Sequence, residues 1–227
     1  MPRLAPLVRR LLAAGAVAFA LGAAGPAAAE VRLLAFGDSL TAGFGVPEGD
    51  GFVPRLEAWL HANGAPDVTV VNAGVSGETS ADGFARIGGA LTPDIDGVIL
   101  ELGANDVLRG LDPRVTRRNL DAILDAIDAH RLPVLVTGIP APPFRPDAER
   151  RAWKAVFRDV AAAHGALYYP SFLAGMGQGR SIPEIMRLMQ RDGIHPNRAG
   201  VRAIVEHIGP AVLELVALAR ERPVSRR

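Results

Sequence analysis

Five short apolar runs, rich in β-branched residues, recur along the chain between longer segments of helical periodicity. This alternation is typical of an α/β domain with a parallel sheet, in which helices cross back over the sheet between strands. The runs are almost continuously hydrophobic, which indicates that helices cover both faces of the sheet. The expected strands are Val31–Phe36, Val68–Asn72, Gly97–Leu102, Pro133–Thr137 and a short Ala166–Tyr169.

The segments between these runs predict five helices. Their expected ranges are Phe52–Asn63, Ser80–Leu91, Pro113–His130, Ala148–His164 and Arg198–Leu218. The last range contains Gly209 and Pro210, and we expect a kink or break there because proline lacks a backbone donor and crowds the preceding turn. No linker-like stretch divides the chain, so the sequence predicts a single domain over residues 30–227.

The first 29 residues have the pattern of a secretory signal peptide. Three arginines precede an uncharged run over residues 11–25, and Ala27–Ala29 offers the small residues of a cleavage site. We therefore expect cleavage after Ala29, a mature chain that begins at Glu30, and a periplasmic or secreted bacterial protein with no stable membrane insertion. An uncleaved membrane anchor is the alternative, although a run so rich in Ala and Gly makes a poor membrane span.

Composition excludes several classes of chemistry. The chain has no cysteine, which rules out disulfides, thiolate metal sites and a thiol nucleophile. Loss of the three leader arginines would leave 22 basic and 24 acidic residues, so no basic field for nucleic acid remains. No metal-ligand spacing, G-x-G-x-x-G or P-loop pattern is present. We therefore expect no metal, no cofactor and no nucleic-acid partner, and the sequence leaves the oligomeric state open.

Polar and glycine-containing motifs follow three of the expected strands. Ser39 comes after the first strand, Asn72–Gly74 closes the second, and Gly103–Asp106 follows the third. In open α/β sheets, ligands bind beyond the carboxyl ends of the strands. We therefore expect these residues to meet at one edge of the sheet.

Ser39, Asp192 and His195 supply a hydroxyl, a carboxylate and an imidazole, which are the three groups of an activated serine nucleophile. Asp192 and His195 are three residues apart, so one turn of chain can bring the carboxylate to the imidazole. Each residue also has an ordinary interpretation: Ser39 as a helix cap or turn residue, Asp192 as a turn cap, and His195 as a surface or core histidine. Together they favour a serine hydrolase.

Gly74 and Asn105 complete an anion site in this interpretation. A glycine N–H can approach a ligand because no Cβ intervenes, and a side-chain amide donates a further hydrogen bond. Both residue types are also common turn formers. Asp38 is interpreted as an Asx-turn residue rather than a chemical group. Glu101, within an apolar strand, is interpreted as a buried hydrogen-bonding residue or as the partner of an unidentified arginine.

Four segments, taken together and in order, resemble the conserved blocks of GDSL or SGNH hydrolases. The resemblance spans nearly the whole mature chain. Residues 103–110 and 192–197 are especially similar to the periplasmic branch that includes thioesterase I, lysophospholipase and arylesterase. The four segments are Phe36–Leu40, Asn72–Thr79, Glu101–Asp106 and Asp192–Asn197.

This resemblance implies a three-layer α/β/α, flavodoxin-like fold with a five-stranded parallel sheet. It implies a serine esterase that hydrolyses small-molecule acyl esters and thioesters, including aryl esters, acyl-CoA and lysophospholipids, through an acyl-enzyme. Carried onto this sequence, the family's roles make Ser39 the nucleophile and Asp192 and His195 the rest of the triad. The oxyanion hole would consist of the Ser39 N–H, Gly74 and Asn105.

Val107, Leu108 and Leu111 follow the third strand, where loops commonly close over substrate. We expect them to line or gate the acyl site, with a place in the core as the alternative. Residues 145–150 and 175–189 have no clear counterpart in the family, which leaves substrate choice open. A carbohydrate O-deacetylase is therefore the alternative enzyme, and a non-catalytic envelope binding protein is the alternative from another class.

Overall fold

The computed structural model describes residues 30–142 and 145–222, so the expected signal segment lies outside the described residues. In these ranges the chain forms a five-stranded parallel sheet in the order β2-β1-β3-β4-β5. Each expected strand is present, and its ends differ from the prediction by at most two residues. The strands are β1 (Val31–Gly37), β2 (Val68–Gly74), β3 (Gly97–Glu101), β4 (Val134–Thr137) and β5 (Leu167–Tyr169).

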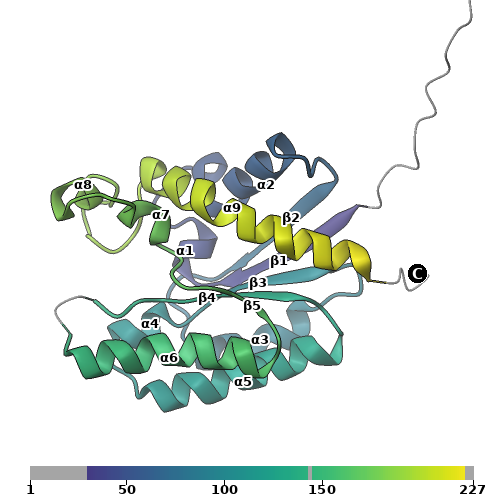
Figure 1. Cartoon of the computed structure of the whole chain (residues 1–227), viewed down its shortest axis with the longest axis horizontal. Helices are drawn as coiled ribbons and strands as arrows, with labels where there is room; N and C mark the ends of the chain where they lie inside the picture. Colours follow the sequence, from purple (N-terminus) through teal and green to yellow (C-terminus); the bar gives the residue numbers. More distant parts are fainter. Residues whose placement is uncertain (1–29, 143–144, 223–227) are drawn as a thin grey trace, which may run out of the picture.

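Helices cover both faces of this sheet, with α2 and α9 on one face and α3, α5 and α6 on the other (Figure 1). This arrangement and the strand order 2-1-3-4-5 confirm the expected three-layer, flavodoxin-like fold. The five long helices are α2 (Phe52–Ala62), α3 (Ser80–Ala90), α5 (Pro113–Ala129), α6 (Asp147–Ala163) and α9 (Arg198–Glu221), close to the predicted ranges.

Short helical turns complete the described architecture, and each spans only three to five residues, too few to show a measurable periodicity in the sequence. All five lie in the segments that follow strands β1, β3 and β5. They are α1 (Ser39–Ala42), the 3₁₀ turn η1 (Glu48–Asp50), α4 (Ala104–Leu108), α7 (Ala174–Gly177) and α8 (Ile182–Met186).

Helix α5 shows how local sequence fixes an element of this fold. Asp112 caps its N-terminus by accepting a hydrogen bond from the Arg114 N–H, and Pro113 occupies the first turn, where its missing donor costs nothing. The buried positions then recur at helical spacing, so a single stripe faces the sheet. These positions are Thr116, Leu120, Ile123, Leu124 and Ile127.

Of the kink or break expected at Gly209 and Pro210, the break is wrong, because α9 runs unbroken from Arg198 to Glu221. Pro210 faces solvent, so it is tolerated where only one backbone hydrogen bond is lost. Gly209 is needed for packing: a Cβ there would lie 2.4 Å from Trp59 of α2. Tertiary packing therefore overrides the local signal. Among the helices of the described ranges, none is both long and apolar enough to cross a membrane.

The register of the central strands sets the geometry of one sheet edge. In the parallel pairs, Gly37 at the end of β1 stands opposite Gly74 of β2 and Glu101 of β3. The segments that follow these three strands therefore leave the sheet at the same level. The strand order also reverses at β1, which is the topological position where open α/β sheets bind ligands.

Candidate active site

Ser39 begins helix α1, two residues after β1 ends. Asp38 caps this helix, because its Oδ1 accepts a hydrogen bond of 3.0 Å from the Leu40 N–H. The turn is tight: a Cβ on Gly37 would lie 2.2 Å from Thr41 Oγ1 and 2.3 Å from the Glu101 carbonyl oxygen. Only glycine fits there, so the turn holds Ser39 at the carboxyl edge of the sheet.

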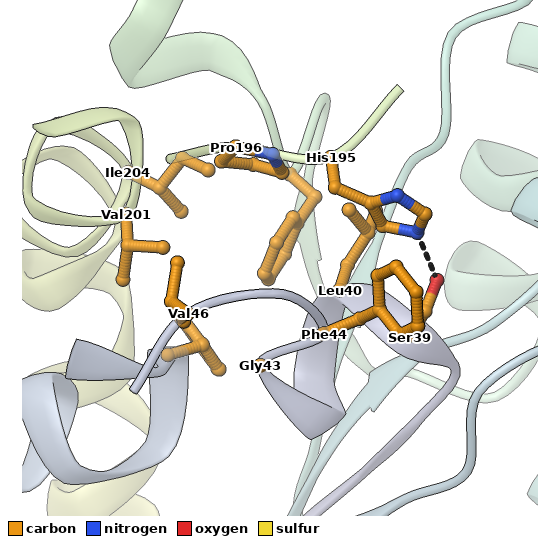
Figure 2. A pocket seen from close by; sticks show the side chains of 11 residues that line it. Ser39, Leu40, Gly43, Phe44, Val46, His195, Pro196, Val201 and Ile204 are labelled. Atoms are coloured by element: carbon orange, nitrogen blue, oxygen red, sulfur yellow. Dashed lines mark hydrogen bonds between the residues drawn. The ribbon is translucent and has the colours of Figure 1, made fainter. Parts of the chain in front are cut away.

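Asp192 and His195 approach Ser39 from the segment before α9. Gly193 has a φ of 67°, a left-handed conformation that turns the chain back toward Asp192. Asp192 Oδ2 then lies 2.7 Å from His195 Nδ1. His195 Nε2 lies 2.9 Å from Ser39 Oγ (Figure 2). The structure therefore brings the three predicted side chains into one hydrogen-bonded chain.

Asp192 is held as a carboxylate by its surroundings. The hydrogen bond with His195 lowers its pKa to about 2, and the N–H groups of Ile194 and His195, at 2.9 and 3.1 Å from Oδ1, add to that shift. An ionised Asp192 accepts a hydrogen bond from the N–H at His195 Nδ1, which leaves Nε2 of a neutral imidazole as an acceptor. Nε2 is then placed to accept the Ser39 hydroxyl proton.

Gly74 and Asn105 reach the same edge from β2 and α4. A Cβ on Gly74 would lie 2.3 Å from the backbone nitrogen of Ala42, so only glycine can pack against α1 there. The Gly74 N–H donates to Asn72 Oδ1 at 2.9 Å. Asn105 Nδ2 donates to the Glu78 carbonyl at 2.8 Å and to Asp38 Oδ2 at 3.3 Å. Both donors are thus engaged by protein acceptors beside the turn that carries Ser39.

Three fully buried carboxyl groups lie at this edge: Asp38, Glu101 and Asp106. Asp106 accepts hydrogen bonds from the N–H and hydroxyl of Ser80 and from Thr116 Oγ1. These contacts join the helices α3 and α5 to the turn of α4. The sequence gives no signal for such a cluster, because Asp38 lies tens of residues before Glu101 and Asp106.

Glu101 is the buried hydrogen-bonding residue that the sequence analysis expected, and its partner is Thr41 rather than an arginine. Thr41 Oγ1 donates to Glu101 Oε2 at 2.8 Å. The other carboxyl oxygen of Glu101, Oε1, is buried with no hydrogen-bond partner among the described residues. Burial raises the pKa of Glu101 well above 4.5, and the nearby Asp38 carboxylate raises it further.

Asp38 forms the expected Asx turn and also contacts the candidate site. Burial raises its pKa to about 6, although the Leu40 N–H and the charge of His195 act in the opposite direction. Its second oxygen, Oδ2, faces Asn105. Asp38 therefore links the N-terminus of α1 to a predicted oxyanion donor, a role that the Asx-turn interpretation did not include.

Because the pKa of Asp38 is raised in the folded protein, we expect the free energy of unfolding to depend on pH through this residue. The folded protein binds the Asp38 proton more tightly than the unfolded chain, so this contribution to stability is complete below about pH 4 and is lost as pH rises through about 6. The unfolding free energy of wild type minus that of Asp38→Asn should therefore fall between pH 4 and pH 6. Urea denaturation at pH 4, 5, 6 and 7 measures it, and a difference that stays constant or grows contradicts the assignment.

An apolar pocket, part of it open to solvent, adjoins Ser39 and His195 (Figure 2). It lies between the α1 segment and α9. Phe44 also lines the pocket, and the centroid of its ring lies 4.6 Å from the centroid of the His195 ring. The remaining apolar lining comprises Leu40, Val46, Phe52, Phe172, Pro196, Val201 and Ile204.

The three residues expected to line the acyl site are placed differently from one another. Val107 is 2% exposed and belongs to the hydrophobic core, so its side chain cannot line an open site. Leu108 and Leu111 are 48% and 38% exposed, at and just beyond the end of α4. None of these three is among the described residues that line the pocket beside Ser39. Sequence reasoning missed Val201 and Ile204, because their helical spacing on α9 is also that of core residues.

No group of three or more histidine and carboxylate side chains in the described ranges could hold a metal ion.

Comparisons with known proteins agree with this geometry. The model of the GDSL-like Lipase/Acylhydrolase family matches residues 35–203. Esterase TesA of Pseudomonas aeruginosa is 36% identical over 210 residues, which cover 92% of this chain and all of that protein. Thioesterase 1/protease 1/lysophospholipase L1 of Escherichia coli K12 is 32% identical over 191 residues, covering 84% of this chain and 87% of that protein.

A solved structure extends the likeness to the fold. The crystal structure of TesA superposes with a TM-score of 0.73 at 36% identity, and the match covers 81% of this chain and 99% of that one. The family match also spans the segments that bear Ser39, Gly74, Asn105, Asp192 and His195. Sequence, fold and the hydrogen-bonded serine therefore lead to one conclusion: the chain belongs to the GDSL-like lipase/acylhydrolase family.

Proposed function

We propose that this protein is a serine esterase that hydrolyses acyl esters and thioesters of small molecules through an acyl-Ser39 intermediate. The observation that carries the proposal is the contact of 2.9 Å between His195 Nε2 and Ser39 Oγ, continued by the contact of 2.7 Å to Asp192. The names of the relatives, an esterase and a thioesterase/lysophospholipase, support this substrate class.

In the proposed reaction His195 moves a proton twice. As Ser39 Oγ attacks the acyl carbonyl, His195 Nε2 takes its proton, and the protonated imidazole then passes that proton to the leaving alcohol or thiol. Asp192 stabilises the imidazolium and keeps the ring in the required tautomer. Water, activated by the same histidine, then hydrolyses the acyl-enzyme and regenerates Ser39.

The Ser39 N–H, the Gly74 N–H and Asn105 Nδ2 are proposed to stabilise the oxyanion. In the described structure Gly74 donates to an amide oxygen, and Asn105 donates to a carbonyl oxygen at 2.8 Å and, at the longer distance of 3.3 Å, to Asp38 Oδ2. A developing oxyanion carries a full charge and is a stronger acceptor than a carbonyl or amide oxygen. These donors should therefore contribute most in the transition state.

Two apolar surfaces of the described structure are proposed to hold the apolar part of a substrate. One is the pocket between the α1 segment and α9. The other is the exposed pair Leu108 and Leu111 beyond Asn105, which keeps the expected acyl-site role as a proposal. Val107 is excluded from it by burial.

Purified residues 30–227 should hydrolyse p-nitrophenyl esters, acyl-CoA or lysophospholipids. Ser39→Ala should abolish both turnover and labelling by a fluorophosphonate, which reacts with an activated serine. Asp192→Asn should lower kcat by up to about 10⁴-fold, because it leaves the imidazole in the wrong tautomer. Steady-state kinetics measure both. Labelling of Ser39→Ala, or a near-normal rate in Asp192→Asn, would contradict the proposed triad, and activity confined to acetylated glycans would select the deacetylase.

The proposed oxyanion role of Asn105 has its own test. Asn105→Ala should lower kcat about 10²–10³-fold with little change in KM, because a donor aimed at the oxyanion acts mainly in the transition state. A turn-forming role predicts the reverse pattern, with a lower melting temperature and a nearly normal kcat for the folded fraction. Kinetics and a thermal melt on the same preparation separate the two.

We propose that the enzyme works outside the cytoplasm as the single domain 30–227. The pattern of the first 29 residues supports this proposal. Mass spectrometry of the protein from the periplasmic or secreted fraction of its bacterial host should find Glu30 at the N-terminus. Recovery of a full-length chain in the membrane fraction alone would reject cleavage and favour the anchor.

A further inference from the structure

Arg86 of α3 contacts three segments of the candidate site at once. Its Nη2 donates to the Gly37 carbonyl at 3.1 Å and to the Ala73 carbonyl at 2.9 Å. Its Nε donates to the Glu78 carboxylate at 2.6 Å. The guanidinium carbon lies 3.9 Å from the centroid of the Phe36 ring. The side chain is only 25% exposed, so these contacts are largely shielded from solvent.

Each of the three hydrogen bonds lies close to one proposed oxyanion donor. The Ala73 carbonyl belongs to the same peptide unit as the Gly74 N–H, and because that unit is planar, holding the carbonyl also fixes the direction of the N–H. The Gly37 carbonyl begins the turn that leads into Ser39. Glu78, whose side chain Arg86 holds, offers its backbone carbonyl to Asn105 Nδ2 at 2.8 Å.

We propose that Arg86 is a positioning residue of the oxyanion hole, which fixes its donors through the ends of β1 and β2 and through Glu78. The inference rests on the proposed oxyanion roles of Ser39, Gly74 and Asn105. Donation to the Ala73 carbonyl also polarises that peptide unit, which strengthens its N–H as a donor. Arg86 itself points at backbone carbonyls and Glu78 and does not contact the reacting atoms.

Arginine suits this task better than lysine. The two hydrogens of Nη2 serve two carbonyls on neighbouring strands, while Nε serves Glu78 from the same rigid plane. A lysine ammonium would keep the charge and can stay over Phe36, but it lacks this fixed geometry. Arg86→Lys therefore removes the planar guanidinium group while it keeps the positive charge.

The test compares Arg86→Met and Arg86→Lys with wild type, with kcat expressed per active site titrated by a fluorophosphonate. Both variants should lose kcat by roughly tenfold to a hundredfold, which is less than the loss on removing an oxyanion donor outright, and KM should change little. The melting temperature of Arg86→Lys should stay close to that of wild type, so this variant remains informative if Arg86→Met does not fold. Arg222→Met is the matched control, because Arg222 also donates to two carbonyls, of Asp96 and His130, but at the opposite edge of the sheet.

A double-mutant cycle with Asn105→Ala decides how Arg86 acts. If Arg86 positions the donors, Arg86→Lys should cost at least about threefold less in kcat when Asn105 is already absent. Equal losses in both backgrounds, a normal kcat per active site in Arg86→Lys, or an equal loss in Arg222→Met would each overturn the proposal. If Asn105→Ala alone keeps the wild-type kcat, the oxyanion assignment fails first, and this outcome is distinct from failure of Arg86 alone.

Discussion

The parallel pairing of β1 with both β2 and β3 is the interaction on which the candidate site depends. It brings Gly37, Gly74 and Glu101 level at one edge. Gly37 and Gly74 must both lack a side chain, because a Cβ on either would lie within 2.3 Å of atoms of the α1 turn. Strand pairing and two close backbone approaches therefore bring the turn that carries Ser39 to the same edge as Gly74 of β2 and Asn105 of α4, the proposed oxyanion donors.

The same edge carries a concentration of buried carboxyl groups that a stable core alone would not contain. An unpaired carboxylate in an apolar interior is strongly unfavourable, and such a group responds by binding a proton more tightly. Glu101 shows this response most clearly: it receives one hydrogen bond from Thr41, and its pKa lies well above the usual value. Perturbed carboxyl groups of this kind cluster at functional sites, where local stability is sacrificed for geometry.

Sequence reasoning was accurate where one local pattern decides the outcome. Periodicity located the sheet and the long helices, and the three-residue spacing of Asp192 and His195 anticipated their contact. It was wrong where distant packing decides, as at Pro210, where the contact between Gly209 and Trp59 accompanies an unbroken helix. The pocket lining from α9 and the contacts of Arg86 depend on which elements the fold brings together, and no spacing in the sequence encodes that.

Asp38 and Asp192 show how one site gives two carboxylates different tasks. The Asp192 side chain is 37% exposed and is stabilised by His195 and two backbone N–H groups, so its pKa falls to about 2 and it remains charged. Asp38 is buried, and its pKa rises to about 6, so its charge is not assured in mildly acidic conditions. Environments that separate two pKa values in this way assign the permanent charge to one residue. Asp192 is therefore suited to hold the imidazolium of His195, whereas Asp38 acts through geometry, as the acceptor that joins α1 to Asn105.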